Sequence, residues 1–454
     1  MSRKHLLPAL LVGLSACRTA GRVDAANNPP QLSDAELKER IERLFVADSD
    51  PRRDNFDILR KAGRRTIPFL VKALDDPRTE SLRFPKGPHD IFEESPLRRI
   101  CGLLTFTPAA EAAKPLAKYV EHPNPAFRGE AASTLGRIAA PDCIEPVKKA
   151  LADRDQEVRQ FALIGIDAGI RENGRHQEFL NGIYDAVAAM MTSGEHYNLS
   201  GPASVLAMID GPKAAPLLES RRYFTTRNPQ LRDVLVGLNF EGHKTPHAIL
   251  MPLMKELAPA AARDGRRGLE FAAALQLYAR NPDPEAEATF RALSESGTDS
   301  VAVGAGKALE ILAGVDTARV MKLGHDGNFA TMTPPQRYYF AVSEYHFEVC
   351  NGGHDQFFYN SAGDLYPTVL EGLHAIGAHT QAATLQEAMN AFGARIETNW
   401  EARRRQMEQL PAGARNIFER SDRQYYESEK RSGERVDVLL SLFAVNYPAD
   451  FARK

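Results

Sequence analysis

Hydrophobic residues recur at helical spacing through most of the chain, and prolines and aspartates divide the pattern into short segments. The clearest recurrence lies between residues 111 and 170, where Pro115 and Pro146 are 31 residues apart, as are Arg128 and Arg159. Each unit has an apolar segment containing the proline, then an Asp or Pro turn, then an alanine-rich segment that the arginine opens. Two landmarks with one shared period predict repeated pairs of helices.

This pattern resembles the HEAT repeat family, including its bilin-lyase-like short variants. Two short amphipathic helices cannot bury their apolar faces alone, so the resemblance implies pairs that stack on their neighbours. We therefore predict an all-α fold, with a HEAT-like helical-pair solenoid over residues 35–325 followed by a small α-helical domain over 332–454. By the same resemblance, the solenoid presents a long surface for protein partners.

Polar residues of the repeats indicate a structural role rather than a catalytic one. Asp153 and Asp155 stand at a repeat turn just before Arg159, and we interpret them as helix caps and hydrogen-bond partners within the repeat. Histidines such as His243 and His247 lack the HExxH spacing or cysteine partners of a metal site. The sequence predicts no metal ligands, no cofactor and no catalytic residues.

The amino-terminal pattern is different. A short basic start precedes nine apolar residues, Leu6 to Leu14, and Leu14-Ser15-Ala16-Cys17 follows the lipobox pattern. This run is shorter than the roughly 20 residues that a membrane-spanning helix needs. Residues 1–17 thus resemble a bacterial lipoprotein signal peptide, which implies a diacylglycerol on Cys17. An ordinary secretory signal or a chance apolar start remains the alternative.

Residues 18–34 have almost no apolar periodicity and include Asn27-Asn28-Pro29-Pro30, so they predict a flexible tether. Arg18 stands where an inner-membrane retention signal typically has Asp. The expected location is therefore the cell membrane, with the outer membrane facing the periplasm favoured over the inner one in a Gram-negative cell.

Another helical pattern begins near Met332. Tyr339, Val342 and Val349 fall at spacings of three and seven, and Asn351-Gly352-Gly353 is expected to end this helix. Nine aromatic residues occur between Tyr338 and Tyr366, a marked concentration in a chain that is 8% aromatic. A further apolar segment follows, ending in Ile-Gly-Ala.

This stretch resembles a small α-helical domain family of uncharacterised function, whose best-known relative is a bacterial DNA-mimic protein. The shared pattern is Asn-Gly-Gly-aromatic-x-Gln-Phe-Phe-x-Asn-x-x-Gly. Here it supplies the candidate binding residues Asn351, Gly352, Gly353, His354, Gln356, Phe357, Phe358, Asn360, Gly363 and Asp364.

Two details of the motif carry expectations of their own. His354 replaces the family's usual aromatic residue; it could line a pocket, but we expect a half-exposed ring. The amides of Asn351, Gln356 and Asn360 could lock a turn by bonding to backbone, which we favour, or form a polar floor for a ligand. Cys350 and Ser361 have His346 and His354 nearby in sequence, and only the fold decides whether a nucleophile meets a base.

Charge and cysteine content narrow the function classes. The chain has 57 Lys plus Arg and 59 Asp plus Glu, a net charge of −2, which argues against a nucleic-acid partner. Residues 332–454 contain 16 acidic and 13 basic side chains, too even a balance to imitate a DNA duplex. Cys101, Cys143 and Cys350 are too widely spaced for a disulfide framework, so we expect small buried apolar residues, although a single pair could form in an oxidising periplasm.

These features favour a membrane-anchored, non-enzymatic scaffold of the cell envelope that binds protein partners through the solenoid and the C-terminal domain. Two alternatives remain. One is a ligand-binding or enzymatic module centred on Asn351 to Asp364. The other is a regulator similar to the DNA mimic, which requires that the signal is not used.

Overall fold

The computed structural model describes residues 32–46, 51–84, 94–195, 197, 200–240, 242–411, 413–431 and 433–453. Their regular structure is helical, and pairing of extended backbone within them is limited to isolated bridges at Phe84–Glu94 and Val315–Ala452. The all-α prediction is thus confirmed. The predicted signal peptide with Cys17 and most of the tether lie outside the described residues, and the first described helix begins at Asp34.

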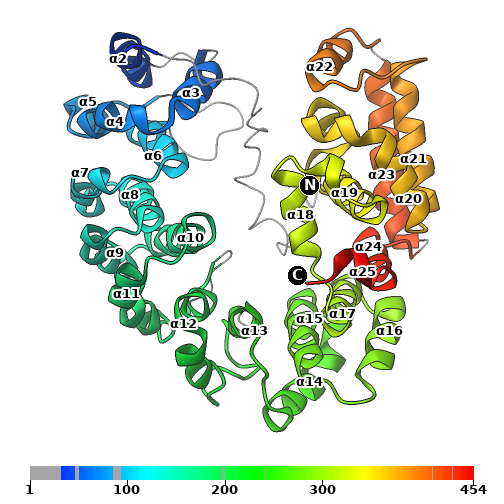
Figure 1. Ribbon diagram of the computed structural model, residues 1–454. Helices are drawn as coiled ribbons and strands as arrows, with labels where there is room; N and C mark the ends of the chain where they lie inside the picture. Colours follow the sequence, from blue (N-terminus) through cyan, green and yellow to red (C-terminus); the bar gives the residue numbers. More distant parts are fainter. Residues whose placement is uncertain are drawn as a thin grey trace. The chain divides into compact units, whose positions relative to one another are not determined.

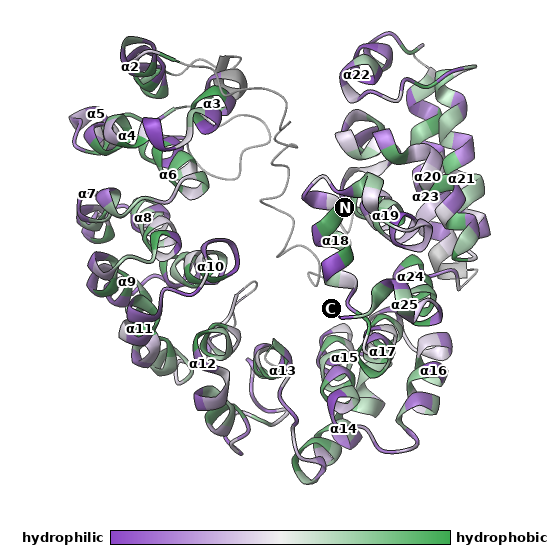
Figure 2. Cartoon of the chain, in the orientation of Figure 1, coloured by the Kyte–Doolittle hydropathy of each residue, from purple (hydrophilic) through white to green (hydrophobic). Residues whose placement is uncertain are grey.

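Contacts within the chain divide it into two compact units, the first ending at His243 and the second beginning at Lys244. Most helices carry both hydrophobic and hydrophilic residues, as amphipathic packing requires (Figure 2). The first unit contains α2 (Asp34–Glu42), α3 (Pro51–Ala62), α4 (Ile67–Leu74), α5 (Pro77–Ser81), α6 (Pro96–Phe106), α7 (Ala113–Ala117), α8 (Pro125–Ile138), α9 (Ile144–Leu151), α10 (Gln156–Asn173), α11 (Gln177–Met190), α12 (Pro202–Leu218) and α13 (Leu231–Phe240).

In the first unit, α8 packs against both α6 and α10, the alternate helices on either side of it in the chain (Figure 1). Glycines allow a close approach between α8 and α10. A Cβ at Gly136 would lie 2.7 Å from the backbone nitrogen of Ile166, and one at Gly169 would lie 2.7 Å from the Gly136 carbonyl oxygen. A Cβ at Gly165 would overlap the backbone of Ser133. The two helices therefore meet backbone to backbone.

Arginines at the starts of the second helices tie adjacent repeats together. The guanidinium of Arg128 donates to both carboxylate oxygens of Asp153, at 2.7 and 2.9 Å, and the two side chains are 7% and 11% exposed. Arg159 donates in turn to the Asp153 carbonyl and pairs with Glu195. Asp155 caps α10 by accepting from the Glu157 N–H at 2.9 Å. The structural interpretation of these turn residues is confirmed.

The second unit continues the helical pairs and then forms the C-terminal domain. Its helices are α14 (His247–Ala261), α15 (Gly265–Arg280), α16 (Ala286–Ser296), α17 (Asp299–Leu312), α18 (Thr317–His325), α19 (Pro334–Tyr359), α20 (Tyr366–Ala375), α21 (His379–Met389), α22 (Trp400–Glu408), α23 (Gly413–Arg431), α24 (Val436–Asn446) and α25 (Pro448–Phe451).

Helix α24 packs against α17, near the end of the repeat-like helices. The buried carboxylate of Glu310 on α17 accepts from the Ser441 hydroxyl on α24 at 2.6 Å, and the Asp316 N–H donates to the Phe451 carbonyl at 2.7 Å. The last pair of a solenoid has no further repeat to cover its apolar face, and here the C-terminal domain supplies the cover. Helices α14–α18 therefore share one compact unit with residues 334 onward, although their sequence pattern continues that of the repeats.

Candidate functional site

The Gly-Gly motif kinks α19 rather than ending it. Gly352 and Gly353 have non-helical backbone angles, with φ of +82° at Gly353, and the helix then resumes and runs to Tyr359. The expectation that the helix stops at 351–353 is wrong because Asp422 on α23 restarts it: its carboxylate accepts from the His354 N–H at 2.8 Å, as a helix cap does. A Cβ at Gly353 would overlap that carboxylate.

His354 is fully buried, so the expectation of a half-exposed ring is wrong. Its Nδ1 lies 2.6 Å from Oδ1 of Asp422, and its Nε2 lies 2.9 Å from the hydroxyl oxygen of Tyr345. A ring with its proton on Nδ1 satisfies the carboxylate and accepts the tyrosine O–H. Tyr345 is fully buried as well, so this Asp–His–Tyr chain links three helix segments and presents no ring atom to a substrate.

Two motif amides converge on a carboxylate that the sequence did not single out. Gln356 Nε2 and Asn360 Nδ2 donate to Oε2 of Glu348, at 2.6 and 2.9 Å. Glu348 is 7% exposed; burial raises the pKa of its carboxyl, and the two amide donors oppose that shift in part. The amides thus join the two halves of α19 through a side chain, where bonds to backbone were expected. Asn351, the third amide, is exposed.

The side chain of Arg403 on α22 is fully buried and donates several hydrogen bonds to the motif region. Its Nε donates to the Phe358 carbonyl at 2.6 Å, Nη2 to the Asn360 carbonyl at 2.8 Å, and Nη1 to Asp364 Oδ1 at 2.8 Å. A Cβ at Gly363 would lie 2.8 Å from Nη2, so this position has room only for glycine. Sequence reasoning missed Arg403 because nothing local distinguishes it within Arg403-Arg404-Arg405.

The aromatic residues of the motif form the centre of the C-terminal core. Phe357 and Phe358 are fully buried. Phe357 packs edge-on against Tyr345, with ring centroids 5.0 Å apart, and Phe358 packs against Phe392 and Phe418. The structure thus brings nearly all the candidate residues together, as a network of buried rings, amides and charges.

Cys350 and His346 do meet, but not as a nucleophile and its base. Cys350 Sγ lies 3.8 Å from both ring nitrogens of His346, so it lies along neither lone pair and makes no directed hydrogen bond. His346 Nδ1 is 2.6 Å from the Tyr425 hydroxyl, and Nε2 is 3.4 Å from Asp437. Burial alone would lower the pKa of His346, but the Asp437 carboxylate raises it well above its ordinary value. His346 and Asp437 thus form a structural ion pair.

Cys101, Cys143 and Cys350 are free thiols. Cys101 and Cys143 are buried, as predicted, and Cys350 is half-buried. Burial raises the pKa of the Cys143 thiol to about 12, so it stays protonated at neutral pH.

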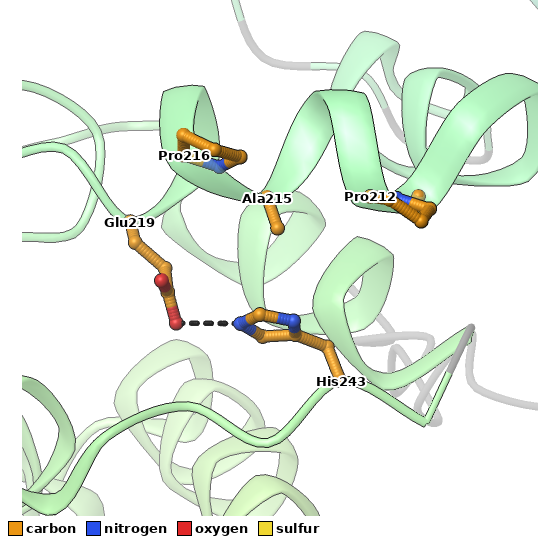
Figure 3. A pocket seen from close by; sticks show the side chains of 6 residues that line it. Pro212, Ala215, Pro216, Glu219 and His243 are labelled. Atoms are coloured by element: carbon orange, nitrogen blue, oxygen red, sulfur yellow. Dashed lines mark hydrogen bonds and ion pairs between the residues drawn. The ribbon is translucent and has the colours of Figure 1, made fainter.

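A pocket of about 360 Å³ lies in the first unit beside the kink of α12, where Asp210 leaves helical geometry (Figure 3). Its polar feature is a hydrogen bond between His243 Nε2 and Glu219 Oε1, at 2.8 Å. The lining residues are Gly211, Pro212, Ala215, Pro216, Glu219 and His243. Within the described part of the chain, no group of three His, Cys, Asp or Glu side chains is arranged to hold a metal ion.

Comparisons with known proteins match the two parts of this architecture. A family model for HEAT repeats matches residues 94–167, and one described as "DMP19-like protein" matches residues 330–444. The fold is that of a helical-repeat protein, and residues 330–444 are similar to the DMP19-like family.

Two individual proteins also align with this chain. Deoxyhypusine hydroxylase from Eremothecium gossypii is 41% identical over 59 residues, which is 13% of this chain and only 18% of that protein. A solved engineered protein aligns over 92% of this chain and 99% of its own, with 14% identity and a TM-score of 0.29.

Proposed function

We propose that the protein is a membrane-anchored scaffold of the cell envelope that binds protein partners through its solenoid and its C-terminal domain. The observation that carries this proposal is the repeat stacking over residues 94–167. Helices that meet at Gly136 and Gly165 and are tied by Arg128 form a continuous array, and such arrays serve as extended surfaces for other proteins.

The polar groups of the C-terminal motif are suited to a structural role rather than to catalysis. Glu348, His354 and Arg403 each hydrogen-bond to a neighbouring segment of the domain, and none of them is more than 7% exposed. A general acid, base or nucleophile must reach its substrate, so these residues are suited to holding the domain together.

Site-specific photo-cross-linking in cells tests the scaffold proposal. A photoreactive amino acid is placed at exposed repeat positions, one at a time: Lys114, Glu121, Arg154 and Glu157. We expect neighbouring sites to yield the same saturable protein adduct. Cross-linking at none of the four sites would contradict binding through the repeats.

The membrane anchor rests on the Leu14 to Cys17 lipobox. Metabolic labelling with a fatty acid is expected to mark the wild type and Cys350→Ser equally and to leave Cys17→Ser unlabelled, because only the lipobox sulfur is acylated. Cys350 serves as the control because it is the half-buried thiol of the folded chain. Equal labelling of Cys17→Ser would refute the anchor. Within the described residues, no helix combines the length and hydrophobicity needed to span a bilayer.

A further inference from the structure

Three side chains form an aromatic and cationic stack on the surface of the C-terminal domain. Tyr359 at the end of α19 is 39% exposed, and Trp400 at the start of α22 is 37% exposed. The guanidinium carbon of Arg404 lies 3.9 Å from the centre of the Tyr359 ring and 5.1 Å from that of Trp400. Both distances suit a cation–π contact. The phenylalanine rings of the motif, Phe357 and Phe358, are instead buried in the core of the domain.

Arg403 holds this stack in place. It fixes α22 to the carbonyls of Phe358 and Asn360, the residues on either side of Tyr359. The next residue, Arg404, is thereby set over the Tyr359 ring, and Trp400 lies one helical turn earlier on α22. The buried Arg403 thus pre-organises the half-buried Arg404, so the stack loses little conformational entropy when a partner binds.

The charge of Arg404 is not neutralised within the described chain. Its neighbour Arg403 pairs with Asp364, and Arg395 lies 3.6 Å from Glu397, but no described carboxylate forms an ion pair with Arg404. A guanidinium that lies flat on aromatic rings keeps N–H donors at its edge, where a carboxylate can accept two of them. Arg405, which is exposed on the same helix, adds a second positive charge.

We propose that the surface formed by Tyr359, Trp400 and Arg404 docks a segment of a protein partner that presents an Asp or Glu beside an apolar side chain. The carboxylate would pair with Arg404, and the apolar side chain would cover the exposed parts of the two rings. Trp, Tyr and Arg are the residues most enriched at interface hot spots. This inference rests on the proposed scaffold function and names one of its binding sites.

Trp400 gives a direct reporter because it is the single tryptophan of the chain. A random twelve-residue display library is panned on the full-length protein after depletion on Arg404→Gln. Each enriched peptide is then synthesised with its acidic residue intact and with the matching amide, and binding is followed by Trp400 emission. Arg405→Gln is the matched control, since it removes an exposed charge of the same helix outside the stack.

We expect enriched peptides to share an acidic residue next to an apolar one. Affinity should fall about tenfold or more for the amide peptide and for Arg404→Gln, as for a hot-spot contact, and change only slightly for Arg405→Gln. Tyr359→Ala, which keeps the reporter, should also weaken binding. Unchanged thermal melting of each variant shows that the fold is intact.

Several results would overturn the proposal: no enriched peptide, peptides without an acidic residue, or equal binding to Arg404→Gln. A shift of Trp400 emission with phosphatidylglycerol vesicles that Arg404→Gln abolishes, in the absence of peptide binding, would assign the surface to membrane contact instead. Repeat adducts formed through residues 94–167 are independent of these residues. Failure of this site therefore differs visibly from failure of the scaffold function.

Discussion

At the scale of single residues, Glu348 is a carboxylate held in the interior for its acceptor oxygen. Its pKa is raised by burial, so the folded domain holds the carboxyl proton more tightly than the unfolded chain does. This contribution to stability is largest at low pH, and it is lost as the pH rises from the ordinary carboxyl pKa through the raised one. Above that range the charge is carried at a cost.

Replacing Glu348 with Gln tests this sign. The amide oxygen can still accept from Gln356 and Asn360, while the buried charge is gone. We expect Glu348→Gln to gain stability relative to the wild type as the pH rises from 4 to 8, measured by urea unfolding followed through Trp400 emission. A stability difference between Glu348→Gln and the wild type that is independent of pH, or that shrinks toward pH 8, would contradict the raised pKa of Glu348.

Asn360 tests whether the motif amides are structural. Asn360→Ala removes one of the two donors to the buried Glu348 oxygen, so it should cost about 1–3 kcal/mol of unfolding free energy. Asn351→Ala, a change to an exposed amide of the same motif, should cost little. An unchanged melting temperature for Asn360→Ala, together with lost partner binding, would instead favour a ligand or partner site.

At the scale of elements, the stacking of α8 on α10 depends on missing side chains. Gly165→Ala would force a methyl group into the backbone of Ser133, so the helices must separate. We expect a loss of about 1–3 kcal/mol, as for overpacked cores, seen as earlier thermal unfolding by circular dichroism. Gly265→Ala is the control because a Cβ there meets no atom within 4 Å. Equal melting of the two variants would mean that the close approach is dispensable.

At the scale of the whole molecule, the contacts between α17 and α24 predict that the C-terminal domain depends for its stability on the repeat-like helices before it. A fragment of residues 244–454 keeps the contacts of α24 with α17, including the Glu310–Ser441 hydrogen bond, whereas a fragment of 332–454 exposes that face. We expect the longer fragment to unfold at a higher urea concentration, with Trp400 as the probe. Identical midpoints would show that the sequence-defined domain is self-sufficient.

Sequence alone determined what depends on near neighbours along the chain. The apolar period, the prolines and the turn aspartates predicted paired helices and their caps, because a helix and its cap are set by residues within a few positions of each other. The motif from Asn351 to Asp364 likewise marked the part of the C-terminal domain where a specific network forms.

Tertiary structure alone decided which distant residues meet. Arg403 donates to the Phe358 carbonyl, Glu348 accepts from the motif amides, and Asp422 accepts from the His354 N–H at the kink of α19. The helical period places each of these residues on a face but does not say which helix covers that face. That choice depends on packing between segments far apart in sequence, where burial turns an ordinary arginine or glutamate into the centre of a hydrogen-bonded network.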